Sequence, residues 1–238
     1  VSHMERLALT FPKYKKFINP VDPLLSALQN KGYVHEENFL KSLNFSKNEI
    51  YKVKKTNKKQ MFTETKKAMR EGKEIIYQAY LENEKFGGFA DFLKKTPGAS
   101  SFGNYHYEVW DTKLTKKIKP YFAIQLSCYS ELLNEIQKKF PEKFSIILGN
   151  NENVQLKLSD FYSYYVELKN NFFKFHDEWK PDNFPDPGDF SDNGKWSNYA
   201  ENLLEENRHL RLVANITKGQ IRALKSTGIY TIDDLANT

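Results

Sequence analysis

The sequence is poor in cysteine, because Cys128 is the only one among 238 residues. A single cysteine excludes an internal disulfide and any metal cluster built on several thiolates. No apolar run approaches the roughly 20 residues that a membrane-spanning helix needs. No secretory leader is visible either, and the opening "VSHM" is typical of an expression-tag remnant, with Met4 as the expected native start. These absences together predict a cytoplasmic protein.

The composition is that of a folded domain with a modest excess of positive charge. Aromatic residues make up 15% of the chain and hydrophobic residues 39%, which is enough for a packed core. The 36 Lys and Arg residues against 30 acids give a net charge of +6, which suits a polyanionic partner without requiring one. The stretch Lys47–Glu74 is strongly basic and Pro181–Gly194 is acidic. Because a lysine-rich run is more often a solvated face, the charge only supports a nucleic-acid partner.

Hydrophobic spacing and turn residues predict a mixed α/β core with a helical end. Gly32 allows a turn or kink in the first long helix, and Thr63 is a candidate cap for the second. The strands at 86–93 and 105–114 are predicted to form a hairpin around the Pro/Gly/Ser loop at 94–104. The tail from 217 resembles a helix-hairpin-helix unit, with Thr231 and Asp234 spaced as a capping box. The predicted helices cover 21–43, 63–73, 120–140, 159–179 and 198–216, and the predicted strands cover 74–81, 86–93, 105–114, 143–150 and 153–158.

A predicted strand carries an acid and a lysine two residues apart. Side chains alternate along a strand, so Asp111 and Lys113 share a face with Tyr105, Tyr107 and Val109. Charges that continue a partly apolar face indicate a strand end that opens into a cleft. The sequence contains four other acid-x-lysine triplets, at residues 64–66, 71–73, 167–169 and 178–180, but these fall in a turn or in a predicted helix. Positions i and i+2 of a helix point apart, so only the strand pair can act together.

Four further residues have chemistry that complements this pair. Asp91 lies on the partner strand of the hairpin, Gln125 and Tyr129 are one helical turn apart, and His35 precedes Glu36. Each has an ordinary alternative: an ion pair for Asp91, helix polar groups for Gln125 and Tyr129, and a surface histidine for His35. Taken together, two carboxylates, an imidazole and a backbone carbonyl can hold Mg²⁺ or Mn²⁺. A nearby lysine can stabilise charge that develops on phosphorus, so the set matches phosphodiester hydrolysis.

Several short segments of the chain resemble a known family. "GGFADFL", "YEVWDTKL" and "QLSCY" resemble motifs II, III and Q-x-x-x-Y of RecB-like nucleases in the PD-(D/E)xK superfamily, and "KGYVHEENFL" resembles their motif I histidine. The resemblance extends over most of the chain. It implies a restriction-endonuclease-like core, with a central mixed β-sheet flanked by helices, over residues 1–180. A helical extension with the helix-hairpin-helix-like tail would occupy residues 181–238.

The resemblance also implies a role for each site residue. His35, Asp91 and Asp111 would bind Mg²⁺ or Mn²⁺, with the Thr112 carbonyl as a further ligand. Lys113 would be the catalytic lysine, and Glu36 is an additional candidate. The residues expected to take part in catalysis are Asp91, Asp111, Lys113, Gln125 and Tyr129.

The chain departs from many of these relatives in one respect. They carry three or four cysteines near the C-terminal side of the core, whereas residues 184–200 contain none. No iron-sulfur cluster is therefore expected, and Cys128 is predicted to be a small core residue. The remaining histidines are assigned to structure or solvent: His106 should face away from Asp111, His176 and His209 lie on predicted helices, and His3 belongs to the apparent tag.

Three functional interpretations remain open at this stage. The first is a metal-dependent deoxyribonuclease acting on single- or double-stranded DNA in repair, recombination or defence. The second is a non-catalytic nucleic-acid-binding module on a nuclease scaffold, with the tail binding the DNA backbone. The third is one part of a larger machine, since relatives are often joined to a helicase domain or subunit. Any such motor lies outside these residues, because they contain no G-x-x-x-x-G-K-[ST] loop.

Overall fold

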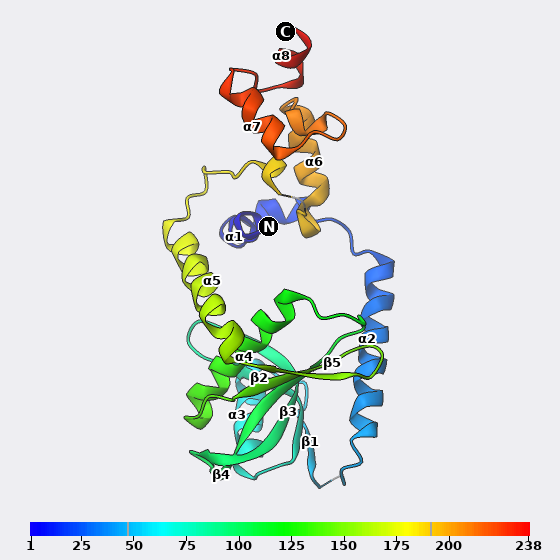
Figure 1. Ribbon diagram of the computed structural model, residues 1–238, viewed down its shortest axis with the longest axis vertical. Coiled ribbons are helices and arrows are strands. Elements are labelled where there is room, and N and C mark those ends of the chain that lie inside the picture. Colours follow the sequence, from blue (N-terminus) through cyan, green and yellow to red (C-terminus); the bar gives the residue numbers. More distant parts are fainter. Residues whose placement is uncertain (47, 191) are drawn as a thin grey trace. The chain divides into compact units, whose positions relative to one another are not determined.

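The computed structural model describes residues 1–46, 48–190 and 192–238, so Lys47 of the basic stretch and Ser191 of the acidic stretch lie outside the described residues. The chain forms two compact units (Figure 1). The core unit is Pro23–Phe173, and the terminal unit combines Val1–Asp22 with Lys174–Thr238. The predicted division at residue 180 placed the first residues in the nuclease core. By their contacts, these residues group instead with the C-terminal part.

The core unit contains a six-stranded mixed sheet, as predicted in outline, and its strands follow chain order from β1 to β6 (Figure 1). The pairs β1–β2 and β4–β5 are parallel, and the other three neighbouring pairs are antiparallel. Sequential antiparallel pairing places the predicted hairpin, β3 and β4, at the centre of the sheet. The strands are β1 (Ile50–Lys52), β2 (Ile75–Glu82), β3 (Gly87–Ser100), β4 (Gly103–Thr112), β5 (Lys143–Ile147) and β6 (Asn153–Lys157).

Helices pack against this sheet through two apolar clusters. The larger cluster joins α3 (Lys58–Arg70) and α4 (Pro120–Gln137) to the face that carries Tyr107 and Val109. The smaller cluster joins α2 (Pro23–Ser42) to the face that carries Tyr77 and Phe92. Helix α5 (Ser159–Glu178) follows β6 and runs beyond the end of the core unit. The fold is therefore an α/β sheet flanked by helices, as the sequence predicted.

Two local predictions in the core unit were wrong. The residues predicted as a loop between the hairpin strands mostly continue the strands, because β3 and β4 stay paired out to Ser100 and Gly103. Pro97 is tolerated there because the ladder is irregular between Pro97 and Ser100, where a missing N–H matters little. Thr63 does not cap α3. The side chain of Asn57 caps this helix by accepting a hydrogen bond from Gln60 N at 3.0 Å.

Gly32 does not interrupt α2, which is one continuous helix. A Cβ added at Gly32 would meet no atom within 4 Å. Glycine inside a helix is destabilising by roughly 0.5–1 kcal/mol relative to alanine. We therefore expect Gly32→Ala to raise the free energy of unfolding by about that amount, as measured by urea denaturation. A less stable variant would contradict the open surroundings of this glycine.

The terminal unit is helical, as predicted for the C-terminal region. The predicted capping box is confirmed, because Thr231 Oγ1 accepts from Asp234 N at 3.1 Å and Asp234 Oδ2 accepts from Thr231 N at 2.9 Å. Of the helices in the described part of the chain, none is long and apolar enough to cross a membrane. The helices of this unit are α1 (Ser2–Thr10), α6 (Ser197–Glu206), α7 (Lys218–Ser226) and α8 (Ile232–Ala236), with 3₁₀ turns at Pro12–Phe17, Pro187–Asp189, Gly194–Trp196 and Leu210–Leu212.

Two histidines of the terminal unit have structural partners that the sequence did not indicate. His209 was predicted to lie on a helix, but α6 ends at Glu206, and the Nε2 of His209 lies 3.0 Å from Asp186 Oδ2. The same carboxylate oxygen accepts from Lys225 Nζ at 2.9 Å. His3 is buried and its Nδ1 accepts a hydrogen bond from Trp179 Nε1 at 3.1 Å. These contacts hold the beginning and end of the chain within one unit.

Candidate active site

The site is built at the end of β4, where a buried acid meets a lysine. Tyr107 and Val109 belong to the core beneath α3 and α4, and Asp111 continues their face with only 2% of its surface exposed. Lys113 lies on the same face, with its Nζ 2.6 Å from Asp111 Oδ2. The Lys113 N–H donates to Ile147 O at 2.8 Å, so pairing with β5 continues past the end of the strand. This hydrogen bond to β5 therefore fixes the position of the Lys113 main chain, from which the side chain extends toward Asp111.

Asp91, on the adjacent strand β3, is hydrogen-bonded to the last residue of β4. Its Oδ2 accepts two hydrogen bonds from Thr112, one from the backbone N–H and one from the hydroxyl, both at 2.8 Å. Thr112 was predicted to offer its carbonyl to a metal ion, and the contacts observed use its other two polar groups. They hold the Asp91 carboxylate beside Asp111.

Helix α4 supplies the two predicted supporting residues. Gln125 Oε1 accepts from Lys113 Nζ at 3.2 Å, and Gln125 Nε2 donates to the Tyr129 hydroxyl at 3.4 Å. A polar chain thus runs from Asp111 through Lys113 and Gln125 to Tyr129. The Tyr129 ring packs against the backbone of Gly88, where an added Cβ would lie 2.7 Å from the ring Cε1. This close approach explains one glycine of the "GGFADFL" segment.

Burial raises the pKa of both aspartates of the site. Burial raises the pKa of Asp111 to about 7, repulsion from Asp91 adds to the rise, and the Lys113 ammonium opposes it. Burial also raises the pKa of Asp91, against the two hydrogen bonds from Thr112. Two carboxylates in one poorly solvated site resist being ionised together unless positive charge lies beside them. Positive charge beside this pair therefore favours its ionised form.

Helix α2 brings Glu36 to this site. Glu36 is 5% exposed, accepts a short hydrogen bond from the Gln78 amide, and lines a cleft of about 490 Å³ together with Gln78 and Asp91. Burial raises the pKa of Glu36 to about 7, and the nearby charge of Asp91 adds to that rise. Glu36 is thus a third acidic group facing the predicted pair.

His35 is the predicted site residue that the structure does not bring to this group. It is partly buried, is not one of the residues lining the cleft, and its Nε2 lacks a hydrogen-bond partner in the described ranges. Successive residues of a helix point about 100° apart, so a helix that turns Glu36 toward Asp91 turns His35 elsewhere. Among the described residues, no three His, Cys, Asp or Glu side chains form a ready-made metal site.

Gln78 is a site residue that the sequence did not indicate. It has a φ of +56° in the middle of β2, and the β2–β3 ladder is interrupted there, since Tyr77 pairs with Phe92 and Ala79 with Ala90. A non-glycine residue in this conformation is strained by roughly 1–2 kcal/mol. Glutamine gives no sequence signal for a left-handed position, as glycine or asparagine would. The strain therefore lies at the residue that holds Glu36.

Replacing Gln78 separates the strain from the side-chain contact. We expect Gln78→Gly to have a free energy of unfolding about 1 kcal/mol higher than Gln78→Ala, because only glycine adopts this φ freely. Both variants lose the hydrogen bond to Glu36, so any reaction at this site should slow by up to about tenfold in each. Urea denaturation and initial rates measure the two effects. An alanine variant as stable as the glycine variant would show that the backbone is relaxed.

Comparisons with protein families and with curated proteins identified no relative of this chain. No protein-family model matches the chain, and no curated protein matches it. The fold and the site alone therefore define its class. It is an α/β protein whose six-stranded mixed sheet carries two carboxylates and a lysine at the end of a central strand.

Proposed function

We propose that this protein is a divalent-metal-dependent deoxyribonuclease of the RecB-like type, with a restriction-endonuclease-like core. The observation that carries the proposal is the lysine–acid pair at the end of β4, with Lys113 Nζ 2.6 Å from Asp111 Oδ2 and Asp91 hydrogen-bonded to the intervening Thr112. Hydrolysis of a phosphodiester needs negative charge to hold a cation and positive charge to stabilise the transition state. This cluster offers negative and positive charge together at the end of β4.

The residues present suit Mg²⁺ or Mn²⁺. Both ions favour carboxylate, carbonyl and water oxygens, and additional positive charge would stabilise the ionised form of both buried aspartates. Asp91 and Asp111 would hold the ion, and Glu36 is placed to join them directly or through water. When bound, such an ion polarises a phosphoryl oxygen and lowers the pKa of a water molecule.

The protein's own groups would position the reactants. The Lys113 ammonium, fixed by Asp111 and Gln125, would orient the attacking water and stabilise negative charge on the phosphate. Tyr129 would hold Gln125 in the orientation that accepts from the lysine. Lys55, at the cleft that Glu36 and Asp91 line, would attract the DNA backbone.

A cleavage assay tests the proposal. Purified protein is incubated with single- and double-stranded DNA in Mg²⁺, in Mn²⁺ and in EDTA. We expect cleavage with at least one metal and none in EDTA, and Asp111→Asn should abolish it, which excludes a contaminating nuclease. If neither DNA form is cut with either metal by the folded protein, the proposal fails.

The second candidate is a nucleic-acid-binding module that does not cleave. The terminal unit supports it through two short helices, α7 and α8, each begun by a capping box and joined by a turn at Gly228 with φ of +89°. Such paired helices can bind a DNA backbone without reading its sequence. DNA affinity that is unchanged in EDTA, without cleavage, would favour this function. A helicase domain or subunit, in repair, recombination or defence, is the partner that the nuclease proposal implies.

A further inference from the structure

The face of β4 that points away from Asp111 carries an unusual row of polar residues. His106, Glu108 and Trp110 alternate with Tyr107 and Val109, so they lie on the opposite face of the sheet. His106 is 3% exposed and Glu108 is 7% exposed. Polar groups of this kind are buried at a net cost unless hydrogen-bonded partners surround them.

Several of these buried groups lack partners. Neither ring nitrogen of His106 has a hydrogen-bond partner in the part of the chain that the structure describes, although its Nε2 lies 3.9 Å from Glu108 Oε1. Trp110 Nε1 also lacks a hydrogen-bond partner there. Ser145 Oγ, on the β5 residue paired with Trp110, is likewise unpartnered. Most buried polar atoms in folded proteins are hydrogen-bonded to protein or to ordered water. Four such atoms on one face are available to form hydrogen bonds with another molecule.

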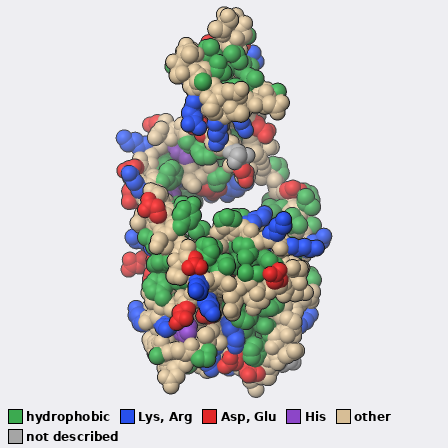
Figure 2. Space-filling view, in the orientation of Figure 1, with side chains coloured by type: hydrophobic (Ala, Val, Ile, Leu, Met, Phe, Trp, Pro, Cys, Tyr) green, Lys and Arg blue, Asp and Glu red, His purple; other side chains and the backbone are tan. Residues whose placement is uncertain are grey.

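These residues form the wall of a cavity of about 530 Å³. The volume is in the range of pockets that bind small molecules. Lysines surround it from β3, from β5 and from the segment after α4, and Figure 2 shows a histidine among lysine and acidic side chains on the core unit. The charged residues that line it are Lys94, Lys95, Lys139, Lys143, Glu74, Glu108 and Glu142. Lysines exceed glutamates, so the cavity favours an anion.

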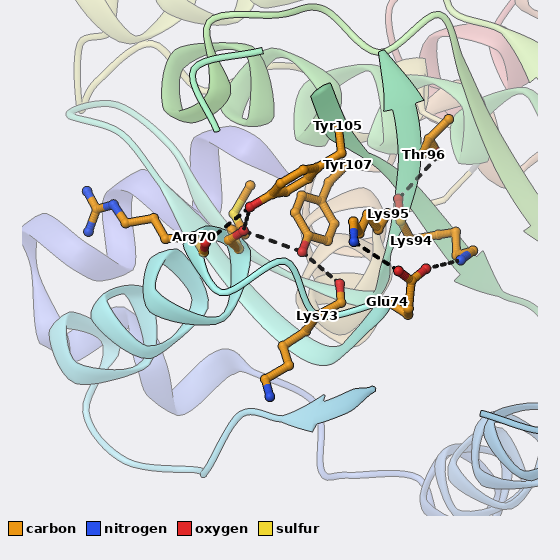
Figure 3. A network of polar contacts seen from close by, with 9 residues as sticks. Arg70, Lys73, Glu74, Lys94, Lys95, Thr96, Tyr105 and Tyr107 are labelled. Carbon is orange, nitrogen blue, oxygen red and sulfur yellow. Dashed lines mark hydrogen bonds and ion pairs between the residues drawn. The ribbon is translucent and has the colours of Figure 1, made fainter. Parts of the chain in front are cut away.

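The lysines differ in how firmly they are held. Lys94 and Lys95 donate to the two oxygens of Glu74 at 3.1 and 3.0 Å, and Figure 3 shows both pointing at this carboxylate. The adjoining turn is anchored by the Tyr107 hydroxyl, which donates to Lys73 O at 2.7 Å. Lys139 and Lys143 form no ion pair with any described residue. Two ammonium groups therefore line the cavity without a carboxylate in direct contact, although the charge of Lys143 acts on Glu108.

We propose that this cavity is a second binding site, on the sheet face opposite Asp111, for a phosphate-bearing small molecule the size of a mononucleotide. Lys139 and Lys143 would bind the phosphate oxygens. Trp110 Nε1, Ser145 Oγ and the His106 ring would supply further hydrogen bonds. Burial raises the pKa of Glu108, which favours a carboxyl group that does not repel the anion. The proposal does not depend on cleavage at the other face.

The three tryptophans provide a direct test. Trp179 Nε1 donates to His3 and Trp196 Nε1 donates to Glu5, both in the terminal unit, so Trp110 is the one indole without a partner among the described residues. ¹⁵N-labelled protein in EDTA is titrated with inorganic phosphate, with AMP, and with short single-stranded DNA with and without a 5′-phosphate. The Trp110 indole signal, identified with Trp110→Phe, should shift saturably with a Kd below about 1 mM. The other two indole signals should stay in place.

Matched variants decide what the shift means. Lys139→Gln combined with Lys143→Gln should weaken binding at least about tenfold, whereas Lys67→Gln, an exposed lysine of α3 that does not line the cavity, should leave it unchanged. A shift with phosphate alone assigns the site to the phosphate group, and a shift with AMP alone assigns it to a nucleotide. No shift with any probe at about 10 mM would mean that only water fills the cavity and would overturn the proposal. A shift with unphosphorylated DNA alone would also overturn it.

Discussion

Replacing Lys113 with alanine is expected to slow DNA cleavage by about 10²–10³-fold or more. The ammonium group contacts Asp111 and Gln125, so its loss removes the positive charge at the site and releases both partners. Its side chain is 21% exposed and its contacts are mainly polar, so the fold should persist. Single-turnover cleavage at saturating Mg²⁺ measures the rate, and circular dichroism checks the fold.

The control for this variant removes a lysine charge from an exposed position outside the site. Lys67 on α3 has a side chain that is 70% exposed, with only a 3.9 Å ion pair to Glu71. Lys67→Ala should therefore cleave DNA at the wild-type rate, because exposed pairs of this kind contribute little. Lys113→Gln, which keeps the length and a hydrogen-bond donor, guards against a folding defect in the alanine variant. A Lys113→Ala protein as active as Lys67→Ala would remove the lysine from the mechanism.

Local periodicity explains why part of the site could be predicted. The alternation of a strand is enough to put Asp111 and Lys113 on one face, and helical spacing is enough to align Gln125 with Tyr129. The contacts between these two pairs then depend only on α4 packing against the face of the sheet that carries Val109. A motif whose residues sit on regular elements is visible in the sequence for this reason.

The remainder of the site depends on tertiary packing. The rotation of α2, which selects Glu36 over His35, is set by Phe39 packing on Phe92 and Trp110 across the sheet, with ring centroids 5.3 and 6.2 Å apart. Period-3.6 patterns show which stripe of a helix is apolar but do not show which polar neighbour of that stripe meets another strand. The left-handed backbone conformation of Gln78 could not be predicted for a related reason, since only its neighbours in space impose that conformation.

Local sequence patterns also could not predict contacts between distant parts of the chain. Glu5 accepts a hydrogen bond from Trp196 Nε1 at 2.9 Å, and its other partner, Lys195, lies 2.9 Å away. The composition of the acidic and proline-rich stretch near residue 190 does not predict that it contacts the first helix. The grouping of residues 1–22 with the C-terminal part follows from such pairs, which no spacing rule reveals.

Gly149→Ala is expected to disable the site without touching any of its charged groups. Gly149 follows β5, and its N–H donates to Thr115 O at 2.9 Å. A Cβ at this position would lie 2.1 Å from the carbonyl oxygen of Leu114 and 2.7 Å from its carbonyl carbon. Backbone atoms cannot yield as a flexible side chain can, so the segment that begins with Lys113 has to move away from β5.

The displaced segment should affect both activity and stability. A shift of about 1 Å in a positioning element lowers a rate by about 10²-fold, and overpacking lowers the free energy of unfolding by about 1–3 kcal/mol. Gly32→Ala is the matched control, because it adds the same methyl group where nothing lies within 4 Å. Cleavage rates and urea denaturation of both variants distinguish a local displacement from a general effect of the substitution. If Gly149→Ala kept wild-type cleavage, the close contact with Leu114 would not be what fixes Lys113 beside Asp111.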